Sequence, residues 1–308
     1  MEESIVTAFS VSSLIHRGVL IGLLLATTAG LAQAQPRFPQ PAEVPDAVVM
    51  QRPSEAEISR AEQMLDGFMN SLSNNEAALF EKYPYLLEVR PPAARNTAII
   101  PNLSPRFEAK HQANLEVVRA GDIDLLFMGD SITDWWRTES GRYAGKPVFD
   151  EYFGDMKVAN FGIAGDTTQG VLYRLQNGEG EGFSPKAVML MIGTNNARAN
   201  LAEEIAEGVG AVVLELQTRF PAAKILLLGI FPRSTHNDPL REKLGRVNSI
   251  IARLDDGESV FYRDIGEIFL DSNGDIPVEI MSDGLHPTTR GYRLWAEAVI
   301  EPLKALIE

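Results

Sequence analysis

The sequence predicts an α/β fold in which helices cover both faces of a five-stranded parallel β-sheet. After residue 121, short apolar runs alternate with longer stretches of helical periodicity, which is typical of right-handed βαβ units. The chain has 308 residues and is 45% hydrophobic, so it can bury a large core in one or two domains. Polar stretches follow several of the apolar runs, at the place where an open α/β sheet binds its ligands.

Five apolar runs are the expected strands, and the stretches between and after them are the expected helices. Strands are predicted at residues 123–128, 158–161, 187–192, 224–230 and 260–263. Helices are predicted at residues 168–175, 202–219, 239–254 and 288–307. By analogy, five such strands suit a flavodoxin-like three-layer sandwich with the strand order 2-1-3-4-5.

The N-terminal residues have the pattern of an export signal. Residues 18–36 carry no charge, an apolar stretch follows Arg17, and Ala32-Gln33-Ala34 has the small-x-small pattern of a signal-peptidase site. The apolar stretch is shorter than the ~20 residues of a membrane span. We therefore expect a signal peptide at residues 1–34, a periplasmic or secreted protein, and no stable membrane span after cleavage. An uncleaved membrane anchor is the alternative.

Residues 35–103 are expected to form a proline-rich linker and a helical extension ahead of the main domain at 104–308. Five prolines lie between Gln35 and Pro53. Ser54 and Glu57 have the spacing of a capping box, and apolar residues then recur at helical spacing as far as Leu72. Packing of this amphipathic helix on the main domain is the favoured role, and a contact in a homodimer or a membrane-surface helix is the alternative.

A further helix is predicted to begin at Ser104-Pro105, with serine as its cap and proline in its first turn. Its apolar stripe contains Phe107 and, one turn later, His111. A histidine on such a stripe is expected to be packed and hydrogen-bonded rather than catalytic.

Composition excludes several classes of function. The formal charge is −14 and the isoelectric point about 4.8, so no basic surface for nucleic acid is expected. The chain has no cysteine, which excludes disulfides, thiolate catalysis and cysteine-ligated zinc. The stretches 178–182 and 271–275 lack the spacing of a dinucleotide loop and of a calcium loop, respectively. No cofactor and no metal are expected.

Four polar stretches carry reactive groups, and a doubly wound sheet would bring them to one edge. They are Gly129-Asp130-Ser131, residues 160–168, Gly193-Thr194-Asn195-Asn196, and Asp283-Gly284-Leu285-His286. Together they offer a hydroxyl nucleophile, an imidazole base, a carboxylate to orient it, and donors for an oxyanion. Each also has a structural alternative, since Ser131 could be a plain helix cap and Asp283 could cap the last helix.

The four stretches resemble the sequence blocks of the SGNH hydrolases, also called the GDSL esterase/lipase family, over roughly Phe107 to the C-terminus. Within that family the chain is most similar to the catalytic subunits of intracellular platelet-activating-factor acetylhydrolase and their bacterial relatives. The resemblance implies that Ser131 is the nucleophile, His286 its base and Asp283 the orienting carboxylate. It also implies an oxyanion hole made by the backbone N–H groups of Ser131 and Gly165 and the side-chain amide of Asn195.

The resemblance implies a serine esterase for short acyl esters, in particular acetyl esters, and acetylated carbohydrate is the expected substrate. A lipid acyl hydrolase is the first alternative, and a non-catalytic carbohydrate-binding module on the same scaffold is the second. Candidates for lining the substrate site are Asp130, Asp166, Thr167, Asn196 and His236. Trp135 and Trp136 are expected to pack the first helix of the domain on the sheet.

Overall fold

The computed structural model describes residues 39–49, 54–82 and 96–308. The predicted signal peptide at residues 1–34 lies outside the described residues, as do parts of the predicted linker. None of the helices in the three described stretches has the length and apolar character needed to cross a bilayer.

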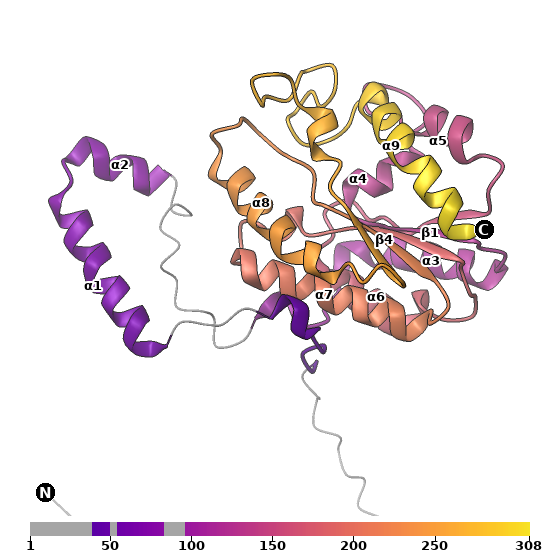
Figure 1. The fold of residues 1–308 in the computed structure, drawn as a ribbon, viewed down its shortest axis with the longest axis horizontal. Helices are drawn as coiled ribbons and strands as arrows, with labels where there is room; N and C mark the ends of the chain where they lie inside the picture. Colours follow the sequence, from indigo (N-terminus) through magenta and orange to yellow (C-terminus); the bar gives the residue numbers. More distant parts are fainter. Residues whose placement is uncertain (1–38, 50–53, 83–95) are drawn as a thin grey trace, which may run out of the picture. The chain divides into compact units, whose positions relative to one another are not determined.

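The sheet has five parallel strands in the order β2-β1-β3-β4-β5, which confirms the predicted fold and strand order (Figure 1). The strands are β1 (Leu125–Gly129), β2 (Val158–Asn160), β3 (Ala187–Met191), β4 (Lys224–Leu228) and β5 (Val260–Arg263). All residues of β1 and β3 are buried, as expected for central strands with helices on both faces. The carboxyl ends of β1 and β3 lie side by side, with Gly129 opposite Met191.

The helices that follow residue 104 form the other two layers of the sandwich. The α-helices are α1 (Glu55–Ser71), α2 (Asn74–Lys82), α3 (Glu108–Ala120), α4 (Ser131–Asp134), α5 (Lys146–Phe153), α6 (Thr168–Arg174), α7 (Ala202–Arg219), α8 (Pro239–Ile251) and α9 (Thr289–Ile307). Short 3₁₀ or π turns are η1 (Asp46–Val48), η3 (Thr97–Ile99), η4 (Pro105–Phe107), η5 (Trp135–Arg137), η6 (Leu175–Glu179), η7 (Thr194–Asn196), η8 (Ala252–Leu254) and η9 (Gly266–Phe269).

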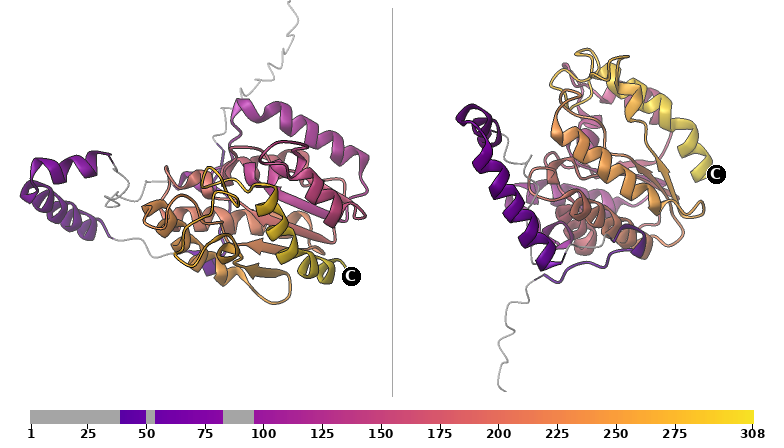
Figure 2. Two further views of the ribbon diagram at one scale, coloured as in Figure 1. Left: turned by 90° about the horizontal axis from the view of Figure 1, so that it is seen from above. Right: turned by 60° about the vertical axis from the view of Figure 1, so that its left-hand side comes forward.

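Two apolar clusters lie on opposite faces of the sheet, because successive strand residues point to opposite sides. Leu126 and Met128 of β1 face one cluster together with α6, α7 and α8. Leu125 and Phe127 face the other together with α5 and α9. The yellow helix α9 accordingly lies across the sheet from the orange helices α7 and α8 (Figure 2).

Two helices were not predicted. Helix α5 follows the first strand and begins at Lys146-Pro147, and its residues Val148 and Phe153 are fully buried. Helix α2 follows α1, and the ring of its Phe80 contacts Phe68 of α1 edge-on, with the ring centroids 5.7 Å apart. Both helices are short, so the sequence shows only about two turns of periodicity in each.

The capping box at the start of α1 is confirmed. The Ser54 hydroxyl accepts a hydrogen bond from the Glu57 N–H, and the Glu57 carboxylate accepts one from the Ser54 N–H. No residue of α1 is buried. The predicted packing of this helix on the main domain therefore stays a prediction.

Part of the predicted extension belongs to the core of the main domain. Val48 of η1 and Ala98 of η3 are fully buried, and both lie against α7. The Asn96 amide donates to the Glu204 carbonyl at 3.0 Å and to the Glu207 carboxylate at 2.8 Å. The main domain thus includes residues on both sides of α1 and α2, before the expected start at residue 104.

A tight turn connects β1 to α4 and presents Ser131. A Cβ atom on Gly129 would lie 2.3 Å from the Thr133 hydroxyl oxygen and 2.5 Å from the Met191 carbonyl oxygen. Asp130 caps α4, since its buried carboxylate accepts the Ile132 N–H at 3.0 Å. Burial, with a smaller repulsion from Asp166, raises the pKa of Asp130 to about 7, although the Ile132 N–H and the Arg233 guanidinium favour the charged form.

We expect Gly129→Ala to lower the free energy of unfolding by about 1–3 kcal/mol, because the added methyl group clashes with neighbouring atoms of the turn. The matched change Gly245→Ala is at an exposed helical site, where the added Cβ would meet no atom within 4 Å outside the helix's own backbone. It should raise that free energy by up to about 1 kcal/mol. Urea denaturation of both variants measures the difference. A Gly129→Ala protein as stable as wild type would contradict the close approach.

We expect Asp130→Asn to change how stability depends on pH. The Asp130 carboxyl ionises near its ordinary value of 3.8 in the unfolded chain and near 7 in the fold, so the wild-type protein loses stability as pH rises between these values. Relative to Asp130→Asn, which keeps a capping oxygen, the loss should reach up to about 4 kcal/mol by pH 8. Urea denaturation between pH 4 and pH 8 measures this difference, and parallel curves would contradict it.

Candidate active site

The structure brings Ser131, His286 and Asp283 together in one chain of hydrogen bonds. Ser131 begins α4 directly after β1, whereas the other two residues lie in the loop that precedes α9. The Ser131 hydroxyl lies 2.9 Å from Nε2 of His286, and Nδ1 of the same ring lies 2.7 Å from Oδ2 of Asp283. This is the arrangement in which an imidazole can take a proton from a hydroxyl.

The spacing of three residues between Asp283 and His286 has a local cause. Oδ1 of Asp283 accepts the backbone N–H groups of Leu285 and His286 at 3.0 and 2.8 Å, which closes a turn and leaves Oδ2 for the imidazole. Burial opposes ionisation of Asp283, but the hydrogen bonds from His286 and Leu285 outweigh it and lower the pKa of the carboxyl. An ionised carboxylate at Nδ1 keeps the proton there and leaves Nε2 to accept the Ser131 proton.

Residues 161–167 form the loop between β2 and α6. We call these residues, together with Thr168 at the start of α6, the oxyanion loop. In this loop every backbone N–H except that of Gly165 donates to another described residue. The acceptors, in order along the loop, are Phe127 O, Asn160 Oδ1, Gly129 O, Asp134 Oδ2, Ile163 O, Asp166 Oδ1 and Asn196 Oδ1. Gly165 adopts φ +85°, a left-handed conformation that favours glycine. Its N–H is thus available to a ligand.

Two further donors complete a candidate oxyanion site. The Ser131 N–H is at the N-terminus of α4, and no partner for it occurs among the described residues. The Asn195 amide nitrogen donates one hydrogen to the Asp166 carbonyl at 2.8 Å, and its second hydrogen remains for a ligand. The Asn195 side chain is therefore fixed in orientation by the oxyanion loop.

Three of the five residues predicted to line the substrate site, Asp130, Asp166 and Asn196, are buried and bonded within the protein, and their contact with a substrate stays a prediction. Asp130 caps α4, and Asp166 forms an ion pair with the buried Arg174. The Asn196 side chain accepts the Thr168 N–H and contacts polar side chains of α6 and the loop before α7. Polar residues at the carboxyl edge of the sheet here support the loops from within.

The other two predicted lining residues are at least partly accessible. Thr167 is half-buried in the oxyanion loop. The His236 ring is half-exposed and lies 2.9 Å from the Asp275 carboxylate. The His236 loop contacts the loop of Asp283 and His286, because the Ser234 N–H donates to the Gly284 carbonyl at 2.7 Å. Their contact with a substrate stays a prediction.

Trp135 is a site residue that the sequence did not reveal. Its ring stacks on the His286 imidazole with the centroids 4.1 Å apart and the planes 27° apart. Tyr143 contacts the same imidazole edge-on at 6.1 Å. Only Trp136 packs fully on the sheet as predicted. The two tryptophans are adjacent in the 3₁₀ turn η5, where successive side chains point about 120° apart, so the two indoles do not pack equally on the sheet.

Two arginines lie beside the candidate oxyanion site. The Arg106 guanidinium lies 3.5 Å from the Gly165 carbonyl, and Arg233 donates to the backbone and side-chain oxygens of Thr194 at 3.3 and 3.2 Å. Burial, with repulsion from Arg198, lowers the pKa of Arg233.

Within the described stretches, no three or more His, Asp or Glu side chains are grouped so as to hold a metal ion.

Comparison with known proteins supports the family resemblance. Residues 127–294 match the GDSL-like lipase/acylhydrolase family. The chain is 36% identical over 220 residues to rat (Rattus norvegicus) platelet-activating factor acetylhydrolase IB subunit alpha2, covering 69% of this chain and 93% of that protein. It is 37% identical over 170 residues to the bovine (Bos taurus) alpha1 subunit, covering 55% of this chain and 70% of the relative.

A solved structure has the same fold. It is a candidate platelet activating factor from Streptococcus pneumonia, with a TM-score of 0.54 and 21% identity, and the match covers 75% of this chain and all of that one. The family match spans more than half of the chain, and the rat relative is matched over nearly its whole length. The chain therefore belongs to the GDSL-like lipase/acylhydrolase family, as its four sequence blocks predicted, and it is a carboxylic ester hydrolase.

Proposed function

We propose that the protein is a serine esterase that removes acetyl groups from carbohydrate esters. The observation that carries the proposal is the hydrogen-bond chain from Ser131 through His286 to Asp283, together with a Gly165 N–H that has no partner among the described residues. A nucleophile, a base with its orienting carboxylate, and oxyanion donors are the groups that acyl transfer needs. A non-catalytic binding module would have no use for a hydroxyl hydrogen-bonded to an oriented imidazole.

The reaction follows from these groups. The Ser131 oxygen attacks the ester carbonyl carbon while Nε2 of His286 takes the hydroxyl proton, and the oxyanion accepts hydrogen bonds from the Ser131, Gly165 and Asn195 donors. Asp283 stabilises the imidazolium, which then gives its proton to the departing alcohol. Water attacks the acyl-enzyme, its proton passes to His286, and the carboxylic acid leaves as Ser131 regains its hydrogen.

Different observations support the proposed acyl group of the substrate and its proposed alcohol. The relatives named above are acetylhydrolases, which supports a small acyl group. Arg106 contacts the Gly165 carbonyl, Arg233 contacts Thr194, and the Tyr143 ring contacts the His286 imidazole. Such polar and aromatic groups suit a hydroxyl-rich alcohol. The predicted export would bring the enzyme to acetylated polysaccharide. A platelet-activating-factor-like lipid is the second candidate, because the relatives carry that name.

We expect Ser131→Ala to reduce kcat for p-nitrophenyl acetate by roughly 10⁴-fold or more, because no other group can form the acyl-enzyme. The melting temperature should change little. A fluorophosphonate probe should label the wild-type protein and not the variant. Ser249→Ala, which removes an exposed hydroxyl on α8, is the matched control and should keep both activity and labelling. Wild-type activity in Ser131→Ala would refute the nucleophile.

We expect kcat/KM to fall steeply beyond butyrate in a series of p-nitrophenyl esters from acetate to octanoate. Each methylene that a small acyl pocket cannot accept costs about 1–3 kcal/mol, or roughly 10–200-fold. Acetylated xylan and a short-chain phospholipid are assayed beside the series. Release of acetate from xylan supports the carbohydrate proposal, whereas faster hydrolysis of the phospholipid favours the second candidate. A rate that rises towards octanoate would refute the small pocket.

A further inference from the structure

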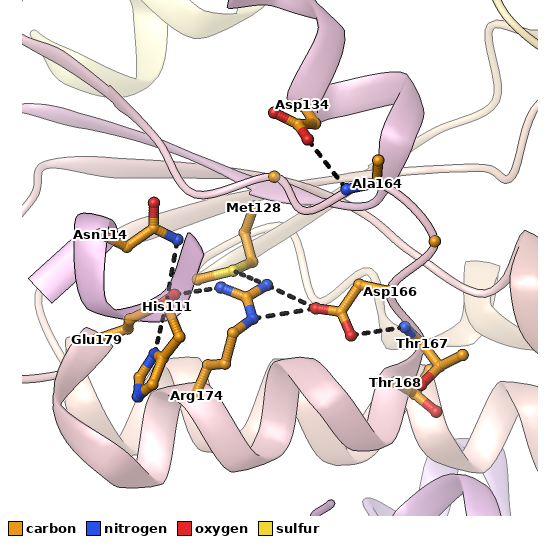
Figure 3. Close-up of polar contacts among 12 residues, drawn as sticks. His111, Asn114, Met128, Asp134, Ala164, Asp166, Thr167, Thr168, Arg174 and Glu179 are labelled. Atoms are coloured by element: carbon orange, nitrogen blue, oxygen red, sulfur yellow. Dashed lines mark hydrogen bonds and ion pairs between the residues drawn. The ribbon is translucent and has the colours of Figure 1, made fainter. Parts of the chain in front are cut away.

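A buried arginine lies beneath the oxyanion loop, outside the hydrogen-bond chain of Ser131. Figure 3 shows the Arg174 side chain reaching from α6 to lie between the carboxylates of Asp166 and Glu179. Nε and Nη2 of Arg174 lie 3.0 and 2.9 Å from Oδ2 of Asp166, and Nη1 contacts Glu179. All three side chains are fully buried. We call them the Arg174 cluster.

The Arg174 cluster is anchored from its far side by α3. Oε1 of Glu179 lies 2.8 Å from Nδ1 of His111 and accepts the Asn114 amide at 3.1 Å (Figure 3). Both residues are buried, so His111 is packed and hydrogen-bonded as predicted. The cluster is therefore held at both ends, by α3 and by the oxyanion loop.

Asp166 connects the cluster to two of the candidate oxyanion donors. Its peptide bond is shared with Gly165, and its N–H donates to the Ile163 carbonyl at 3.0 Å. Its carbonyl oxygen accepts the Asn195 amide at 2.8 Å, and its Oδ1 accepts the Thr167 N–H at 2.8 Å. The position of the Asp166 carboxylate thus fixes both the backbone at Gly165 and the orientation of the Asn195 amide.

A second carboxylate holds the other side of Gly165. Oδ2 of Asp134 accepts the Ala164 N–H at 3.0 Å (Figure 3). Asp134 is itself paired with Arg137, which also donates to the carbonyls of Asn160 and Gly162. The residues on both sides of Gly165 are thus tied to charged groups. Glycine itself has no side chain to hold it in its left-handed conformation.

Stability alone does not explain a buried ion cluster, because apolar side chains of similar volume often stabilise a core as well or better. The fixed geometry of such a cluster suits the positioning of neighbouring groups. Catalysis is sensitive to placement, and an error of about 1 Å in a positioned group can cost ~10²-fold in rate. The Gly165 N–H and the Asn195 amide are two groups of this kind.

We propose that Arg174, acting through Asp166 and supported by Glu179, is a positioning residue that sets the Gly165 N–H and the Asn195 amide for binding the oxyanion. The inference rests on the proposed esterase function and adds a determinant of its rate that lies outside the site. The cluster touches neither substrate nor reacting atoms, and it acts on the transition state through the loop it holds.

The test compares Arg174→Met, Arg174→Lys and Glu179→Gln with the control Leu303→Ala. Leu303 is fully buried near the end of α9, in the apolar cluster on the other face of the sheet from α6, so its truncation destabilises the fold away from the Arg174 cluster. For each variant we would measure the melting temperature, kcat and KM for p-nitrophenyl acetate, and inhibition by phenylboronic acid. The boronate adduct of a serine places an oxygen where the oxyanion forms.

We expect Arg174→Met to lower kcat by about 10- to 100-fold while KM changes less than about two-fold. The inhibition constant of phenylboronic acid should rise by a similar factor, because the adduct needs the same donors. Arg174→Lys should be intermediate, since an ammonium cannot bridge both carboxylates as the planar guanidinium does. Glu179→Gln, which keeps the shape of the side chain, should lower kcat less than Arg174→Met.

The inference is overturned if kcat and boronate inhibition of the cluster variants match those of Leu303→Ala at similar melting temperature, because the cluster would then only stabilise the fold. If Arg174→Met does not fold, Glu179→Gln decides by the same comparison. Failure of the proposed function is a separate result, seen as a wild-type protein that neither hydrolyses p-nitrophenyl acetate nor reacts with a fluorophosphonate.

Discussion

The contact between the Ser131 hydroxyl and the His286 imidazole requires two segments 155 residues apart in the chain to meet within 2.9 Å. A parallel sheet makes this possible, because the loops after all its strands emerge at one edge. Helix α9 holds the two segments together, since its buried Tyr292 hydroxyl donates to the Ile132 carbonyl of α4 at 2.8 Å. The rings of Tyr292 and Trp295 also pack on Trp136, directly beyond α4. The nucleophile and its base are thus joined through the core.

Polar groups with a structural role can be told from those available to a ligand by whether they have a hydrogen-bond partner within the protein. A buried N–H or carboxylate without a partner is costly, so the loops at this edge pair nearly all their polar groups internally. Asp166 and Asn196 are used entirely in this way. The Gly165 N–H is an exception, because it has no partner among the described residues. It lies next to the peptide bond between Gly165 and Asp166, and Asp166 is paired with the buried Arg174.

Apolar runs predicted the strands, because such runs are local features of the sequence. The strand order came from an analogy, and the roles of the three residues in the hydrogen-bond chain came from the family resemblance. The sequence did not predict which polar residues are buried. An aspartate such as Asp166 is expected at the surface, and its burial depends on the ion pairs that Arg174 forms with Asp166 and Glu179 in the fold. Helix α5 was missed for a similar reason. Its proline and aromatic residues favour a helix only weakly, and burial of Phe153 against Phe127 and Trp136 decides its structure.

Residues that precede the expected start of the main domain at residue 104 contact the elements that support the candidate active site. Helix α7 has Gly208 and Gly210 where Ala98 and Val48 pack, and a Cβ on either glycine would lie within 3.0 Å of these neighbours. The Ala98 carbonyl also accepts the Thr168 hydroxyl at 2.7 Å, at the first residue of α6. Because the oxyanion loop runs directly into α6, residues 96–99 support that loop from outside, as the Arg174 cluster supports it from beneath.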